Sequence, residues 1–172
     1  MKVSLNLIRK YVDLPEGLTD EQIAYDMTLR TVEVEDVENT AKKFHDIVVG
    51  EILEIKAHPN ADKLRICMVN IGEEEPVQIV CGGSNLYVGE HVVVSKPGAE
   101  VVWHGQGEPV KITKTKMRGE SSYGMICAST EVYLSDFFPN EGEEEIVDLK
   151  GFDCKPGDSV ADLFGMNDTV LE

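Results

Sequence analysis

A short cationic stretch is the part of this sequence whose side chains could do chemistry most directly. Within eight residues there are four basic side chains and no acid: Lys111, Lys114, Lys116 and Arg118. Residues two apart share a face of an extended strand, so Lys114, Lys116 and Arg118 would project together. Such a row could bind successive phosphates, and a solvated strand face explains it equally well.

A second polar feature is the run His58-Pro-Asn-Ala-Asp-Lys-Leu64, which separates two strand-like stretches. Pro59 fixes its own φ and favours an extended His58, and the residues that follow are typical of a turn. A tight corner is therefore predicted, with Asn60 and Lys63 exposed to solvent. Turn chemistry explains every residue of the run except Lys63, which could be a further phosphate-binding group.

The sequence shows no sign of a catalytic or metal centre. Its four cysteines form no C-x-x-C pair and its four histidines have no metal-ligand spacing. We recognise no nucleotide-binding signature and no pairing of a nucleophile with a base. The apolar runs are too short to cross a bilayer, and no signal peptide is evident. These features predict a reduced, cytoplasmic protein with free thiols at Cys67, Cys81, Cys127 and Cys154, and without a structural metal.

The charge distribution limits any interaction with nucleic acid. The net charge is −16, and residues 129–172 carry 12 acidic and only 2 basic side chains. Affinity for nucleic acid comes mainly from Lys and Arg displacing counterions, so a chain this acidic is a poor general phosphate binder. A nucleic-acid function must therefore rest on a local basic patch.

The middle of the chain has the pattern of a small β domain. Short apolar or alternating runs recur between turns, without an internal repeat. Few strands at this spacing indicate a small closed barrel or a sandwich, and closure into a barrel would remove exposed strand edges. The expected strands are residues 47–57, 64–72, 77–82, 90–95, 110–117 and 123–128.

The two ends of the chain have a different pattern. Ser4 is a candidate cap for a helix to Val12, and Thr19 with Gln22 has the form of a capping box before a helix that reaches Leu29. Alternation from Val32 to Val37 predicts a strand. This piece is too small to be stable alone. Residues 166–172 look like the start of another strand without a stop signal, so we expect the natural chain to continue.

Several motifs occur in an order that resembles a known family. They are the turn at residues 58–64, Val80-Cys-Gly82 with Asn85, and Arg118-Gly119 followed by Ser122-x-Gly-Met125. Together they resemble the OB-fold tRNA-binding domain shared by several synthetases and by free-standing tRNA-binding proteins. The flanking motifs Tyr11-Val-Asp-Leu-Pro15 and Asp168-Thr-Val-Leu-Glu172 look like the N-terminal part of the bacterial phenylalanyl-tRNA synthetase beta subunit. Glu120, Ser121 and Tyr123 depart from the residues that are commoner in that family.

The resemblance implies a fold. It is mainly β with an α/β flank: a five-stranded Greek-key OB barrel inserted into a small α/β domain made from both termini. The implied boundaries are residues 1–39 and 152–172 for the terminal domain and 40–151 for the OB-fold domain. The terminal domain would supply the packing partner that the N-terminal piece lacks.

The resemblance also implies a function. The chain would be an accessory tRNA-binding module that contacts the tRNA backbone without sequence preference and catalyses nothing itself. The candidate tRNA-binding residues are Lys63, Asn85, Lys114, Lys116, Arg118 and Ser122. In such a synthetase ATP, Mg²⁺ and phenylalanine bind outside this stretch, with ATP and phenylalanine on the alpha subunit, so no cofactor is expected here.

Two alternatives remain open at this stage. The chain could be chiefly an assembly module of the synthetase with negligible tRNA contact, which its acidity favours, or a free-standing, dimeric tRNA-binding protein. The expected partners are tRNA, bound weakly by the chain alone, together with the alpha subunit and the remaining beta-subunit domains. Neither a membrane nor DNA is expected as a partner.

Overall fold

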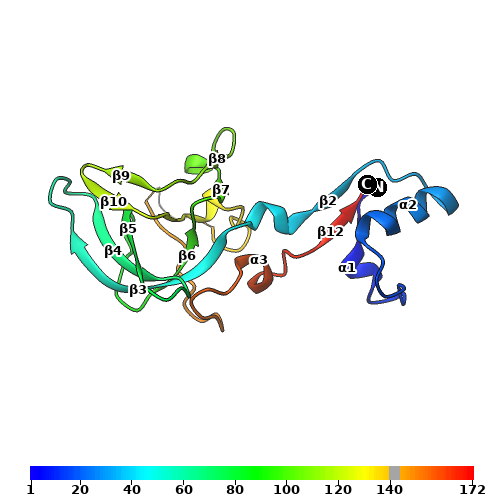
Figure 1. Cartoon of the computed structure of the whole chain (residues 1–172), viewed down its shortest axis with the longest axis horizontal. Helices are drawn as coiled ribbons and strands as arrows, with labels where there is room; N and C mark the ends of the chain where they lie inside the picture. The colour runs from blue at the N-terminus through cyan, green and yellow to red at the C-terminus, as the bar shows by residue number, and fades with distance from the viewer. Residues whose placement is uncertain (140–143) are drawn as a thin grey trace. The chain divides into compact units, whose positions relative to one another are not determined.

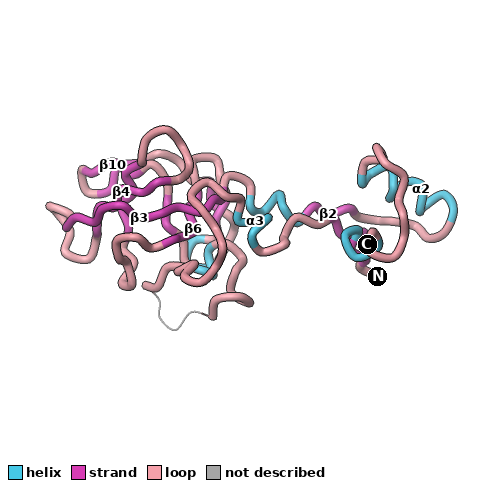
Figure 2. The backbone as a smooth tube through the Cα atoms, turned by 90° about the horizontal axis from the view of Figure 1, so that it is seen from below, coloured by secondary structure: helices cyan, strands magenta, loops and turns pink. Residues whose placement is uncertain are grey.

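The computed structural model describes residues 1–139 and 144–172. The chain divides into two compact units, one formed by Met1–Lys42 with Phe164–Glu172 and the other by Lys43–Leu163. The second unit is mainly strand and loop, as the colouring in Figure 2 shows, with the short helix α3 (Val160–Leu163) and a 3-10 turn at Ser129–Glu131. A further 3-10 turn, Thr40–Phe44, spans the boundary between the units.

The larger unit is built on one antiparallel sheet that curls into a nearly closed barrel (Figure 1). The barrel closes where residues 122–123, just before its last strand, meet β5 (Val77–Cys81). There the Tyr123 N–H donates to the Gln78 carbonyl (2.8 Å), and the Val80 N–H donates to Ser122 Oγ (3.0 Å). The predicted five-stranded OB-fold barrel is thereby confirmed. In spatial order its strands are β11 (Met125–Ile126), β6 (His91–Ser95), β3 (Ile47–Ala57), β4 (Arg65–Asn70) and β5 (Val77–Cys81).

Alternating apolar side chains from these strands form the barrel core. Cys67 and Val69 on β4 and Val92 and Val94 on β6 are fully buried, as the two-residue period requires. Ile52 lies beside a bulge in β3, where the register with β4 shifts. The strands predicted at 47–57, 64–72, 77–82 and 90–95 are therefore present, with ends that differ by up to two residues.

The segment that follows the barrel completes the sheet edges. The Leu149 N–H donates to the His91 carbonyl (2.8 Å), and the Val49 N–H donates to the Asp158 carbonyl (2.9 Å). His91 on β6 and Val49 on β3 each have a neighbouring strand on one side only. The segment after the barrel supplies the missing backbone hydrogen-bond partner on the other side. For this reason the barrel unit extends to Leu163, and the terminal unit resumes at Phe164 where residue 152 was expected.

Residues 96–124 form a long excursion between β6 and β11. The strand predicted over 110–117 is not continuous: it is interrupted at 112–114, because residues 110–111 pair with 100–101 whereas residues 115–117 pair with 120–122. Residues 120–122, which lie between the expected strands, form a strand of their own, and the final strand is shorter than predicted. The elements are β7 (Glu100–Val101), a 3-10 turn (Trp103–Gly105), β8 (Val110–Lys111), β9 (Thr115–Met117) and β10 (Glu120–Ser122).

The terminal unit is a three-stranded antiparallel sheet with two helices. β12 (Thr169–Leu171) lies between β1 (Val3–Ser4) and β2 (Val37–Asn39), so both ends of the chain share one sheet (Figure 1). α1 (Leu5–Ile8) is capped by Ser4, and α2 (Asp20–Arg30) begins with the predicted Thr19–Gln22 capping box.

Two details of the terminal unit differ from the sequence prediction. α1 ends at Ile8, and Val12 is 52% exposed where the helical pattern placed it on the buried face. The strand expected over 32–37 starts only at Val37, because the Val34 N–H bonds to Thr28 Oγ1 and the Glu35 N–H to the Glu172 carbonyl. The predicted strand at the C-terminal end is present as β12.

The cysteines and the remaining composition signals fit this architecture. All four thiols are unpaired, as predicted, and Cys67, Cys81 and Cys127 are buried. Burial raises the pKa of the Cys67 and Cys127 thiols to about 12, so neither forms a reactive thiolate at neutral pH. Within residues 1–139 and 144–172 no helix is long and apolar enough to cross a membrane, and no three His, Cys, Asp or Glu side chains are grouped to hold a metal.

Candidate nucleic-acid interface

Lys116 and Arg118 lie on a tight β-hairpin formed by β9 and β10, and Lys114 directly precedes β9. Met117 pairs with Glu120, so only Arg118 and Gly119 form the turn. Their φ angles are 50° and 100°, and two positive values define a type I′ turn, whose twist matches that of the strands. Gly119 adopts this conformation without strain. The turn leaves the Arg118 side chain exposed at the tip of the hairpin.

The turn at residues 58–64 holds this hairpin in place. His58 is only 6% exposed, and its Nε2 lies 3.0 Å from the Met117 carbonyl oxygen. The Asn60 N–H donates to His58 Nδ1 (3.0 Å), which places the proton of a neutral ring on Nε2, where it can donate to Met117. Asn60 Nδ2 donates to the Arg118 carbonyl (3.1 Å). His58 and Asn60 therefore position the cationic turn through its backbone.

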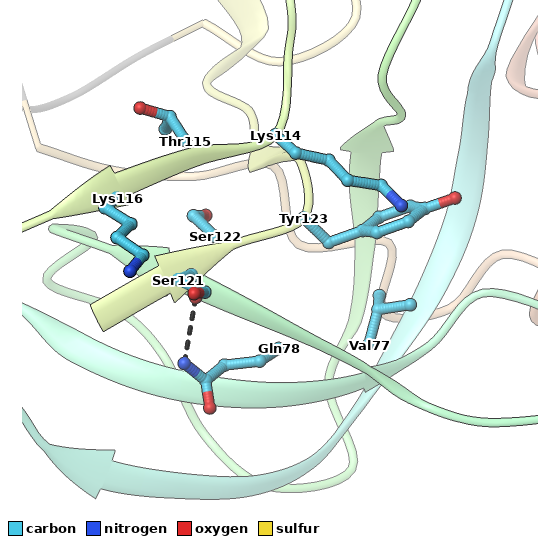
Figure 3. A pocket seen from close by; sticks show the side chains of 8 residues that line it. All are labelled: Val77, Gln78, Lys114, Thr115, Lys116, Ser121, Ser122 and Tyr123. Atoms are coloured by element: carbon cyan, nitrogen blue, oxygen red, sulfur yellow. Dashed lines mark hydrogen bonds between the residues drawn. The ribbon is translucent and has the colours of Figure 1, made fainter. Parts of the chain in front are cut away.

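A cavity of about 440 Å³ lies between the hairpin and β5. Figure 3 shows Lys114 and Lys116 reaching into it from one side and Tyr123 forming its far end. The Lys114 ammonium is 4.7 Å from the centroid of the Tyr123 ring, a cation–π contact that holds the amine near the cavity. Gln78 donates to the Ser121 carbonyl (2.8 Å), the dashed contact in the figure, and so joins β5 to β10.

The four predicted cations differ in how free their charges are. Among the described residues, Lys114, Lys116 and Arg118 form no ion pair. Lys63 pairs with Glu144 at 3.2 Å, and both side chains are mostly exposed. An exposed pair of this kind contributes little energy, so a phosphate could compete for Lys63. The hairpin region thus offers three positive charges without an ion-pair partner among the described residues, beside one acid, Glu120 on β10, and the turn at 58–64 offers a fourth that is partly neutralised.

The two polar residues of the predicted site have internal roles. Ser122 is 2% exposed; its hydroxyl accepts from the Val80 N–H and donates to the Gly124 carbonyl. The Asn85 amide donates to the Ile146 carbonyl and accepts from the Ile146 N–H, both at 3.0 Å. The Ser122 hydroxyl is buried in these contacts, and Asn85 is fixed to the Ile146 backbone, so both residues support the structure around the predicted site.

The sequence analysis missed three residues at this site. Tyr123 and Gln78 line the cavity, and Asn60 holds the hairpin, yet none of them was a candidate. Tyr123 could have been noticed from the sequence, because it is an aromatic residue beside the cationic stretch and departs from the family pattern.

The loops after the first and fourth strands of an OB barrel are regular sites of nucleic-acid binding. In this chain they are residues 58–64 and 96–124, and they meet at the hairpin.

Comparison with known proteins identifies a family. Residues 47–158 match the family model described as "Putative tRNA binding domain". The phenylalanine–tRNA ligase beta subunit of Halalkalibacterium halodurans is 38% identical over 172 residues, which are 100% of this chain and 20% of that protein. That of Bacillus licheniformis is 40% identical over 173 residues, 100% of this chain and 21% of that protein.

These matches confirm the resemblance inferred from the sequence motifs. The chain spans about a fifth of the length of the curated relatives it matches. Among solved structures, the C-terminal domain of Plasmodium vivax p43 is 28% identical and covers 46% of this chain and 43% of its own. Its TM-score is 0.35, too low to support a structural conclusion.

Proposed function

The chain belongs to the tRNA-binding domain family, and we propose that it binds the tRNA backbone through the β9–β10 hairpin. The carrying observation is that Lys116 and Arg118 on the hairpin, with Lys114 directly before it, form no ion pair among the described residues. Phosphate contacts need positive charge and carry no sequence information. Binding should therefore be independent of sequence, with His58 and Asn60 setting the position of the hairpin.

The expected affinity is low. Three or four cations displace few counterions, and non-specific binding has a dissociation constant on the order of 10⁻⁴ to 10⁻⁶ M at physiological salt. The net charge of −16 opposes approach of an RNA, so the chain should lie at the weak end of that range. A weak contact is still useful beside stronger ones, because linkage raises its effective concentration.

We place this module within a phenylalanine–tRNA ligase. Relatives that match the whole chain carry that name, and the chain spans about a fifth of their length. The rest of the beta subunit and an alpha subunit would be its partners, and the ligase chemistry with ATP, Mg²⁺ and phenylalanine would take place there. This chain would contribute tRNA affinity and orientation.

An assembly function without tRNA contact is the second candidate, and the acidity of residues 129–172 favours it. Titration of the 172-residue chain with phenylalanine tRNA and with an unrelated tRNA at low salt separates the two. We expect equal affinities, reduced by Lys114→Gln/Lys116→Gln. The control Lys150→Gln/Lys155→Gln removes the same charge from exposed positions in the same unit and should have little effect. No binding even at low salt would favour the assembly function.

A further inference from the structure

A second cavity lies on the other side of strand β9. Its volume is about 400 Å³, and Thr115 lines both this cavity and the one that holds Lys114 and Lys116. The two cavities therefore flank a single strand of the hairpin. The lining of the second is largely apolar and comes from several loops and strand ends; it includes Leu64, Val80, Met117, Met125, Ile126 and Ile146.

One side of this cavity is a large aromatic surface. Trp103, the single tryptophan of the chain, lines it and is 48% exposed. Its indole meets the His104 ring edge to face, with 5.3 Å between ring centroids. Exposed aromatic side chains beside a cationic strip are the usual platform on which unpaired bases stack.

One acidic side chain of this cavity, that of Glu131, is buried. Glu131 is 8% exposed, and its Oε2 accepts from the Ala128 N–H at 2.8 Å. Burial raises the pKa of the Glu131 carboxyl above its ordinary value. Hydrogen bonds from the backbone N–H groups of Ala128 and His104 oppose this rise without cancelling it. A carboxylate has about four acceptor sites, so this one can still accept from an amino group. Glu144 and Lys63, which pair with each other at 3.2 Å, also line the cavity, so Glu131 is its buried acidic group.

We propose that this cavity binds an unpaired nucleobase that carries an amino group, from an RNA strand whose phosphates contact Lys114 and Lys116. The base would stack on Trp103 and donate its amino group to Glu131. This inference rests on the proposed tRNA contact and adds what that contact lacks, which is a preference for single-stranded nucleotides of a given kind. A peptide of a partner protein is the competing occupant, and the lysines on the neighbouring side favour RNA over it.

The fluorescence of Trp103 provides a direct test, because the chain has no other tryptophan. Short oligo(A), oligo(C) and oligo(U) and a blunt RNA duplex are titrated into the 172-residue chain at low salt. We expect saturable quenching by oligo(A) and oligo(C), at least several-fold weaker binding of oligo(U), and no quenching by the duplex. Trp103→Ala should weaken oligo(A) binding roughly ten-fold, as loss of one stacked base does. The slope of log affinity against log salt should stay unchanged.

The control is Phe137→Ala, which removes an aromatic side chain of similar exposure (47%) that does not line the cavity. Oligo(U) binding equal to that of oligo(A), or quenching by the duplex, would overturn the proposal. So would quenching by an alpha subunit with none by RNA, which would assign the cavity to a protein partner. If tRNA binding responds to the lysine variants while Trp103→Ala has no effect, only the base site is wrong. If tRNA does not bind, the proposed function itself fails.

Discussion

At the residue scale, His58 connects two loops that are far apart in the sequence. Its buried ring accepts from Asn60 on one loop and donates to Met117, 59 residues away, on the other. A buried hydrogen-bonding group without a partner costs about 1–3 kcal/mol. The ring therefore stabilises the position of the hairpin as well as the turn in which it lies.

Replacing His58 by Phe keeps the ring shape and removes both hydrogen bonds. The free energy of unfolding, measured by urea denaturation, should fall by about 1–3 kcal/mol, because the Met117 carbonyl and the Asn60 N–H lose their partner. His45→Phe serves as the control: that side chain is 77% exposed, so its replacement should change stability by no more than about 0.5 kcal/mol. Equal losses in the two variants would show that the His58 bonds do not stabilise the fold.

Glu90 makes stability depend on pH. It is fully buried; Oε2 accepts from the Tyr87 N–H, and Oε1 has no partner among the described residues. Burial, and to a smaller extent Asp148, raises the pKa of this carboxyl from 4.5 to about 7. The folded chain then holds the proton more tightly than the unfolded chain. Its contribution to stability is complete below pH 4.5 and is lost as the pH rises to about 7.

Glu90→Gln should therefore stabilise the protein only where the native carboxyl is ionised. At pH 8 we expect the free energy of unfolding to rise by about 1–3 kcal/mol relative to the native chain, and at pH 5 to change much less. Denaturant titrations of both chains at the two pH values measure this difference. A gain of the same size at both would mean that the ionisation of Glu90 is not the cause.

Residue type and spacing single out the cations, whose contact with tRNA stays a prediction, but they do not reveal the roles of the polar residues. Lys114, Lys116 and Arg118 can be recognised because four cations without an acid are conspicuous in an acidic chain. Ser122 and Asn85 were assigned to the ligand, and the structure uses their hydrogen-bonding groups internally. A polar residue type does not reveal whether its partner is the protein or a ligand, because that depends on contacts between distant segments.

At the element scale, the β9–β10 hairpin exposes basic side chains together on one part of the protein surface. Arg118 has a φ of 50°, a conformation that Asn adopts more readily than Arg, and Asn-Gly is the preferred pair for a type I′ turn. The turn therefore accepts a slightly unfavourable residue at its tip. On our account the Arg118 side chain is there for its charge.

Arg118→Asn separates the two roles of this position, which are to form the type I′ turn and to supply a positive charge. The unfolding free energy should stay within about 0.5 kcal/mol of the native value or rise, because Asn suits the turn. Binding to tRNA should weaken uniformly across tRNA sequences, and its salt slope should become shallower by about 1, as expected for the loss of one phosphate contact. Unfolding and binding titrations on the same preparation measure both. Unchanged binding would remove Arg118 from the interface.

Local sequence rules predicted the regular strands of the barrel better than the excursion between β6 and β11. Apolar runs bounded by turn residues identify β3 to β6, with clear period-two alternation in β4, because the barrel core buries the apolar side chains of these strands. Between residues 96 and 124 the chain is held by long-range bonds, such as the Gly98 N–H to the Ile112 carbonyl and the His58 ring to Met117. No local pattern encodes such partners, so the break in the predicted strand at 110–117 could not be seen.

At the scale of the whole molecule, the two units depend on different parts of the chain. β12 is the central strand of the terminal sheet, and Leu171 belongs to its small core with Leu5 and Ile23. The barrel core contains none of these residues. One of the two units is formed by two separate stretches of the chain. The family resemblance predicted this arrangement, whereas the composition gave no indication of it.

Deleting residues 164–172 should unfold one unit and leave the other. Without β12, the β1 and β2 strands have no partner in the sheet, so amide protons over residues 3–39 should lose their protection from hydrogen exchange. Protection over residues 47–126 should remain, because β3, β4, β5, β6 and β11 pair only within the barrel unit. Hydrogen exchange followed by mass spectrometry compares the two chains. Loss of protection throughout would show that the units fold as one.

The salt dependence of tRNA binding tests most directly the claim that hairpin cations contact phosphates. Each contact contributes roughly 0.7–0.9 to the slope of log affinity against log salt, so three or four contacts predict about −3 for the native chain. Lys114→Gln/Lys116→Gln should make the slope shallower by about 1.5. Lys150→Gln/Lys155→Gln, which changes the net charge equally, should leave it unchanged. A native slope of this size that Lys114→Gln/Lys116→Gln does not alter would contradict the account.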